Sequence, residues 1–180
     1  MYHINTLYEL PYLEYWVHEE KPNITIGNFY EYYNLSQEFG LLTELVEQKK
    51  KEFGKDLQYY EALKNDNQIY REIYEGEVSR NLDDYLDRYG IEMMKLPINT
   101  LFNIFNHQNC SLQNHDLAYN LIKIHYNQTN DQSIFILLPC LDGAKLNQKN
   151  LEDLIISKNL HANFMPKFDH NCINSALHKQ

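Results

Sequence analysis

Apolar residues recur at helical spacing through residues 95–156, in four short segments separated by polar stretches. Pro97 is suited to open the first segment, because proline is favoured at the first position of a helix. Connections of about four to eight residues are typical of helices that pack as antiparallel neighbours. The apolar positions of the four segments are Ile98, Leu101, Phe102 and Phe105; Leu117, Ala118, Leu121, Ile122 and Ile124; residues 134–141; and Leu151, Leu154 and Ile155.

The front of the chain predicts two helices joined by almost no loop. The first covers residues 28–39, with Asn28 as its N-cap, and Gly40 stands where a helix end favours a left-handed residue. The second covers residues 41–53 and is closed by Gly54. Its expected inward positions are Leu41, Leu42, Leu45 and Val46.

Residues 55–94 predict three further helices, at 56–63, 67–74 and 82–89. We expect Gly76 to break the second of these runs and Gly90 to end the third, since glycine is unfavourable inside helices. The candidate buried positions of the first two are Tyr59, Tyr60, Ile69, Tyr70, Ile73 and Tyr74.

The apolar run at residues 134–141 fits either a buried strand or a buried helix by periodicity alone. Helical neighbours on both sides, and the lack of a second strand to pair with, favour the helix. Glycine and proline number only six and five, fewer than a chain rich in β-turns needs. We therefore predict an all-α fold, an irregular antiparallel helical bundle of about eight short helices.

Charge divides the chain into unequal halves. Residues 1–90 hold 18 acidic and 9 basic residues, a net charge of −9, whereas residues 91–180 hold seven of each. Nucleic-acid binding rests on cationic side chains, so we expect no nucleic-acid partner. The basic cluster at residues 49–51 lies between Glu47 and Glu52, as on a solvated helix face.

The sequence favours a soluble protein of the cytoplasm or nucleus. The longest apolar run has eight residues and contains Pro139, far short of the about 20 that a membrane span needs, and no signal peptide is recognisable. The three cysteines, Cys110, Cys140 and Cys172, are few and widely spaced, which fits reduced thiols.

The segment at residues 95–104, followed by residues 115–119, 137–146 and 151–155, resembles the BACK domain, a helical bundle found after BTB domains in adaptor proteins. Residues 23–45 resemble the closing helix pair of a BTB domain, and the whole pattern is similar to BTB/BACK-like proteins of protists. The resemblance implies a BTB-tail-like part at residues 1–55, without the β-strand and helix core that precedes these helices in a complete BTB domain, and a BACK-like bundle at 56–160. Residues 161–180 have an irregular pattern, and we expect a weakly ordered tail there.

The chain contains few sequence patterns that indicate metal binding or catalysis. His107, Cys110 and His115 are close in sequence, as are His170 and Cys172, but their spacing does not give the four converging ligands of a zinc site. No cysteine or histidine has the sequence context of a nucleophile. The carboxylates Asp83, Asp84 and Asp87 are expected on an exposed helix, where their pKa values would not suit acid catalysis. We expect no catalytic, cofactor-binding or metal-ligating residues.

The sequence therefore predicts a non-enzymatic protein-interaction or scaffold module whose oligomeric state is open. Its candidate partner contacts are Tyr2, Tyr8, Tyr12, Tyr15 and Trp16. These aromatic side chains could equally pack onto the helices at residues 28–53. The alternatives are a substrate adaptor of a cullin-type ubiquitin ligase, which would make a cullin the partner, and a small metal-dependent or thiol hydrolase.

Overall fold

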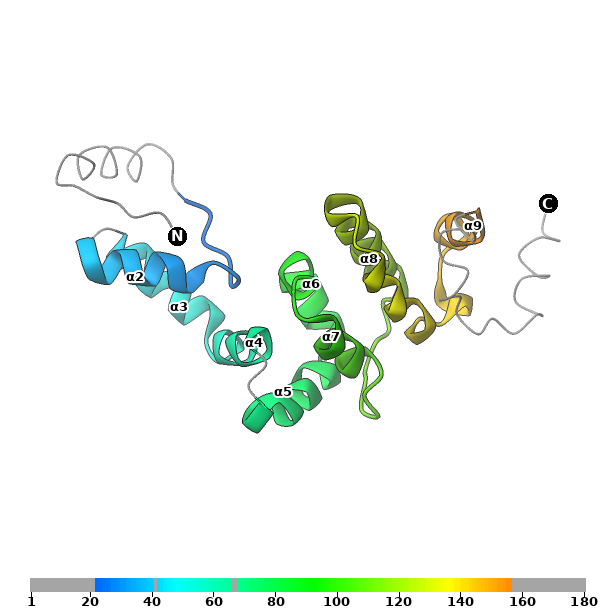
Figure 1. Cartoon of the computed structure of the whole chain (residues 1–180), viewed down its shortest axis with the longest axis horizontal. Helices are drawn as coiled ribbons and strands as arrows, with labels where there is room; N and C mark the ends of the chain where they lie inside the picture. Colours follow the sequence, from blue (N-terminus) through cyan, green and yellow to red (C-terminus); the bar gives the residue numbers. More distant parts are fainter. Residues whose placement is uncertain (1–21, 41, 66–67, 157–180) are drawn as a thin grey trace. The chain divides into compact units, whose positions relative to one another are not determined.

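The computed structural model describes residues 22–40, 42–65 and 68–156, and the regular elements of this part are all helical (Figure 1). The predicted all-α bundle is therefore confirmed. The chain divides into two compact units, Met1–Gln58 and Tyr59–Gln180. The tail predicted at residues 161–180 lies outside the described residues.

The first unit contains the predicted helix pair, α2 (Phe29–Phe39) and α3 (Thr43–Phe53), which pack on each other. Gly40 adopts the expected left-handed conformation, with φ of 68°. The Phe29 and Phe53 rings meet edge to face with their centroids 6.0 Å apart, and both side chains are buried. Of the four inward positions predicted for α3, Val46 is buried, Leu42 and Leu45 are half-buried, and Leu41 is not among the described residues.

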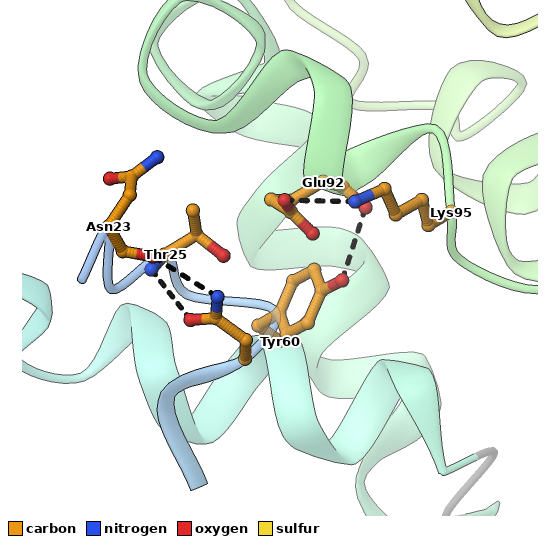
Figure 2. Close-up of polar contacts among 6 residues, drawn as sticks. Asn23, Thr25, Tyr60, Glu92 and Lys95 are labelled. Atoms are coloured by element: carbon orange, nitrogen blue, oxygen red, sulfur yellow. Dashed lines mark hydrogen bonds and ion pairs between the residues drawn. The ribbon is translucent and has the colours of Figure 1, made fainter. Parts of the chain in front are cut away.

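Asn28 precedes α2 as predicted, but its side chain does not cap the helix. Its Oδ1 instead accepts a hydrogen bond from the Thr25 backbone N–H at 2.7 Å. Its Nδ2 donates to the Asn23 carbonyl at 3.2 Å (Figure 2). The asparagine therefore closes the loop that leads into the helix, as short polar side chains commonly do at turns.

The second unit begins within α4 and continues through seven further helical elements. They are α4 (Asp56–Lys64), α5 (Gln68–Arg80), α6 (Leu82–Met93), α7 (Ile98–Phe105), α8 (His115–Thr129), the 3₁₀ helices η1 (Gln132–Cys140) and η2 (Gly143–Lys145), and α9 (Gln148–Ile156). Helix α8 is the common neighbour, since it contacts α6, η1, η2 and α9 (Figure 1). Helices α5 and α7 contact each other, and α7 also contacts η1.

The core of the second unit lies around α8. Ala118 and Ile122 are fully buried on one face of this helix, and Tyr119 beside them is one of the largest fully buried side chains. Most of the facing residues are aliphatic, and the ring of Phe135 on η1 contacts Tyr126 at 4.7 Å. The buried side chains of the neighbouring elements include Leu82 and Leu86 on α6, Leu101 and Ile104 on α7, and Ile134, Leu137 and Leu138 on η1.

The run at residues 134–141 is a buried helix, as predicted, but it is the 3₁₀ helix η1 rather than an α-helix. Asp131 begins it by accepting a hydrogen bond from the Ser133 backbone N–H at 2.9 Å. Pro139 lies within η1 and cannot donate a backbone hydrogen bond. Nine residues is long for this tight helix, so its burial between α7 and α8 is what maintains it.

The prediction that Gly76 breaks its helix is wrong, whereas the helix predicted at residues 82–89 does lose helical geometry at its predicted end, where Tyr89 has φ of −130° and ψ of 17°. Gly76 lies inside α5, which continues to Arg80, and Gly90 lies inside α6, which continues to Met93 past a kink at Tyr89. A Cβ atom added at Gly90 would lie 2.6 Å from Leu121 Cδ1 on α8. Gly90 therefore directly follows a break in the helix and also permits the close approach of α6 and α8.

Three predicted core positions are exposed in the structure. Tyr70 is 47% exposed, Ile73 60% and Ile124 39%, whereas Glu75 on the same helix as the first two is buried. A buried hydrogen bond joins α5 to α7: Ser79 Oγ donates to the Ile104 carbonyl at 2.8 Å, so the side of α5 that carries Ser79 faces α7. This orientation buries Glu75 and turns Ile73 to solvent.

Gly90→Ala should lower the free energy of unfolding by about 1 kcal/mol, the low end of overpacking costs, because its methyl group would overlap only the end of the Leu121 side chain, which has to shift. Gly76→Ala is the matched control: its methyl group would make ordinary contacts with His107, the nearest at 3.4 Å, so helix propensity should raise stability by about 0.5–1 kcal/mol. Urea denaturation measures both. If the close approach is right, combining Gly90→Ala with Leu121→Ala will cost less than the sum of the two single changes.

Candidate functional site

Polar residues come together at the start of α8, in a group that we call the α8 clasp and that includes Asp83 and His115 from the sequence analysis. It consists of Asp83, Asn114, His115, Asp116, Asp142, Asn147 and Asn150. These residues come from α6, α8, the link between η1 and η2, and α9. The clasp therefore joins the two ends of the second unit's core.

The sequence predicted Asp83 to be an exposed carboxylate, but in the structure its side chain is hydrogen-bonded. Its oxygens accept hydrogen bonds from the backbone N–H groups of Gln113, at 2.9 and 3.1 Å, and Asn114, at 3.0 Å. Asn114 then caps α8, since its Oδ1 accepts from the Leu117 N–H at 3.0 Å. The first N–H groups of a helix have no partner within it, and a capping side chain supplies one.

His115 and Asp116 hold the other end of the clasp. The Nδ1 atom of buried His115 accepts from the Asp142 backbone N–H at 3.1 Å, which places the proton of the neutral ring on Nε2. Asp116 Oδ1 accepts from the Asn147 N–H at 2.9 Å and from Asn150 Nδ2 at 2.8 Å. Both side chains tie α8 to the segment that leads into α9.

The pKa values in the clasp follow these contacts. Burial lowers the pKa of His115, and the charge of Lys145 lowers it further against the opposing charges of Asp142 and Asp83. Burial alone would raise the pKa of Asp116, but the hydrogen bonds from Asn147 and Asn150 outweigh it, so the net pKa is lowered. A neutral imidazole and an ionised carboxylate that are both engaged with backbone and amide groups form a structural junction.

A second polar cluster lies between α5 and α7. The carboxylate of buried Glu75 accepts from Asn103 Nδ2 at 3.2 Å and pairs with Arg71 Nε at 3.5 Å. Burial raises the pKa of Glu75, and the Asn103 hydrogen bond and the Arg71 charge only partly oppose this. A perturbed carboxyl is a common mark of active sites, but the contacts of Glu75 with Asn103 and Arg71 are those of a structural link between α5 and α7.

The candidate metal ligands and thiols are spread over different contacts. His107 Nδ1 accepts from the Asn109 N–H at 3.1 Å, while His115 belongs to the clasp. In the described ranges no three histidine, cysteine or acidic side chains come together as a metal site. Burial raises the pKa of Cys140 to about 11, which keeps its thiol protonated and weakly nucleophilic at neutral pH. His170 and Cys172 lie outside the described residues.

The predicted partner contacts Tyr2, Tyr8, Tyr12, Tyr15 and Trp16 also lie outside the described residues. Their role as contacts stays a prediction. One candidate site among the described residues is a small groove formed by the C-terminal parts of α6 and α8, which we call the α6–α8 groove.

The α6–α8 groove has a volume of about 40 Å³ and is partly open to solvent. Met94 and Leu121 line it with buried side chains, whereas Ile91 is 50% exposed and Ile124 39% exposed. Its remaining lining residues are Lys95, His125, Gln128 and Thr129. The groove thus combines an apolar floor, two exposed aliphatic walls and a polar edge.

Lys95 at the groove is held in place by its neighbours. Its Nζ pairs with Glu92 Oε1 at 3.0 Å, and the Glu92 carbonyl accepts a hydrogen bond from the Tyr60 hydroxyl at 3.2 Å (Figure 2). Tyr60 thereby ties α4 to the C-terminal end of α6. Burial, followed by the nearby charge of Glu92, raises the pKa of Tyr60, so its hydroxyl stays a donor.

No protein-family model matches this chain. Neither a curated protein nor a solved structure matches it significantly. The chemistry of the site is therefore inferred from the geometry of this chain. None of the described helices is both long enough and apolar enough to cross a bilayer.

The groove was missed at the sequence level for a definite reason. Ile124 falls at helical spacing with Leu117 and Leu121, so periodicity assigned it to the core. Ile91 directly follows Gly90, which was expected to end the helix. Only the packing of α6 on α8 shows that the two isoleucines lie at one opening.

Lowering the pH should destabilise the wild-type chain more than His115→Asn, whose Oδ1 can accept the Asp142 hydrogen bond without titrating. The lowered pKa of His115 means that the folded state binds fewer protons than the unfolded state. This stability is present above the ordinary histidine value of 6.5 and is lost as the pH falls through the lowered pKa. The loss cannot exceed about 1.4 kcal/mol per pH unit for one proton. Urea denaturation of both proteins from neutral to acidic pH tests this, and a difference that does not vary with pH would refute it.

Ile91→Gln should change the free energy of unfolding by less than about 0.5 kcal/mol, because half of this side chain already meets water. Met94→Gln at the same groove should cost more than about 2 kcal/mol, since it places an amide at a buried position. Thermal or urea denaturation compares the two. Equal costs would show that Ile91 belongs to the core rather than to an open surface.

Proposed function

We propose that this chain is a non-enzymatic protein-interaction module whose α6–α8 groove receives an aliphatic side chain from a helix of a partner protein. The observation that carries the proposal is the convergence of two exposed isoleucines, Ile91 and Ile124, on one groove with a buried floor. Exposed apolar groups that gather at a hollow mark interaction sites more strongly than the same groups scattered singly.

The shape of the groove favours a helical partner. Two neighbouring helices form its walls, and an amphipathic helix commonly places its apolar side chains into such a groove. Gln128 and Thr129 at the edge offer hydrogen-bonding groups beside the apolar walls, which is the usual arrangement of a protein interface.

The size of the groove sets the strength of this contact. A hollow of about 40 Å³ that is partly open to solvent takes no more than the end of one aliphatic side chain, and even complete burial of such a side chain contributes only about 1.5–3 kcal/mol. That is too little for a lasting complex, because association itself has a larger entropic cost. The groove therefore acts as one anchor point within a wider contact.

The roles of the ionisable groups support a function without catalysis. Glu75 and His115 have shifted pKa values, but each holds neighbouring elements together and neither lines the groove. The resemblance of the sequence to BTB and BACK domains points to adaptor proteins, the same class of function. That resemblance, and with it a role as cullin adaptor, stays a prediction.

A photo-crosslinking residue at Gln128, in the full chain within cells of its own organism, tests the proposal. Ile91→Asp and Ile124→Asp should abolish crosslinks that the wild-type chain forms, because each places a charge on an apolar wall. Ile156→Asp is the control, since Ile156 is an equally large exposed side chain outside the groove. Crosslinks that persist in both groove variants, or their absence from the wild-type chain, would contradict the proposal.

A further inference from the structure

A second surface lies on α4 and α5, formed by exposed Tyr70 and Ile73 and half-buried Tyr59 and Tyr74, and we call it the tyrosine face. The Tyr59 and Tyr74 rings have their centroids 4.6 Å apart, and the Tyr70 and Tyr74 rings stack at 5.7 Å. Tyr70 and Ile73 are 47% and 60% exposed. Stacked rings hold one another in place, so they offer a rigid apolar surface with little conformational entropy to lose on binding.

Cationic side chains cover tyrosine rings elsewhere in this chain. Lys50 Nζ lies 5.5 Å from the ring centroid of Tyr33, and Arg88 Cζ lies 5.0 Å from the ring centroid of Tyr89. Lys123 lies 5.7 Å from that of Tyr119. Among the described side chains, no such cation lies over Tyr59, Tyr70 or Tyr74. The tyrosine face thus keeps open ring surfaces of the kind that attracts lysine and arginine.

The charge around the tyrosine face has the complementary sign. The stretch from Tyr59 to the end of α5 at Arg80 contains five acidic residues and three basic ones, a net charge of −2. All three basic side chains have acidic neighbours, since Lys64 lies 4.0 Å from Glu61, Arg71 lies 3.5 Å from Glu75 and Arg80 lies 2.6 Å from Glu77. Exposed Glu72 forms no ion pair with another described residue.

We propose that the tyrosine face binds a cationic segment of a protein partner, with an arginine or lysine over the Tyr70 ring and an aliphatic side chain against Ile73. The surplus of negative charge steers such a segment toward the face and repels nucleic-acid phosphates. This inference is independent of the α6–α8 groove, because the two surfaces share no residue.

Titration calorimetry of the full chain with a short helical peptide, bearing arginines and leucines at helical spacing, tests the proposal. The peptide's matched partner carries citrulline at each arginine, which keeps the shape and removes the charge. We expect the arginine peptide to bind at physiological salt and Tyr70→Leu to weaken it by about fivefold, as loss of one cation–π contact implies. The citrulline peptide should bind more weakly and should not respond to Tyr70→Leu.

Tyr30→Leu is the control variant, because Tyr30 is 41% exposed, carries no charge and lies on α2. It should leave the affinity for the arginine peptide unchanged, as should Ile124→Ser in the groove. An equal loss in Tyr30→Leu and Tyr70→Leu, no loss in either, or no binding of the arginine peptide would overturn the proposal. Tighter binding of a single-stranded RNA than of the peptide would overturn it as well.

Discussion

The α8 clasp is the constraint on which the second unit depends. The first backbone N–H groups of a helix have no partner within the helix, and side-chain acceptors placed there stabilise its start. Asn114 and Asp83 supply acceptors for the N–H groups at and just before the start of α8, while His115 and Asp116 use their own acceptors to hold η2 and α9. Below the clasp, buried Tyr119 donates to Asp153 on α9 at 2.8 Å, so the same helix is fixed at two levels.

The packing of the other helices around α8 determines which side chains remain exposed at the α6–α8 groove and the tyrosine face. Gly90 lets α6 approach Leu121 closely, and beyond the kink at Tyr89 the last turn of α6 carries Ile91 to the edge of the α6–α8 groove. Elsewhere in the second unit, Ser79 on α5 is hydrogen-bonded to α7. In the resulting orientation of α5, Tyr70 and Ile73 face solvent. Both proposed contact surfaces are therefore rigid parts of the scaffold rather than loops.

The sequence predicted the helices well wherever their apolar spacing and their end signals agreed. Helix α7 begins just after Pro97, and α2 ends at left-handed Gly40, both as expected. Gly76 was misinterpreted as a helix end, whereas Gly90 follows the kink at Tyr89 and also allows a close contact with Leu121, a role that the sequence does not distinguish from a helix end. The exposed positions could not be predicted either: apolar spacing shows which face of a helix can be buried, but which neighbour covers it depends on distant residues such as Ser79 and Leu121.

Native-state hydrogen exchange of the full chain tests this account most directly, since it measures the opening free energy of each backbone amide. If α8 is the element on which the second unit depends, the amides of Ala118, Tyr119 and Ile122 will exchange only through global unfolding of that unit, at the slowest rate within it. Amides of α5 or α7 that outlast those of α8, or an α8 that exchanges through local opening, would contradict it.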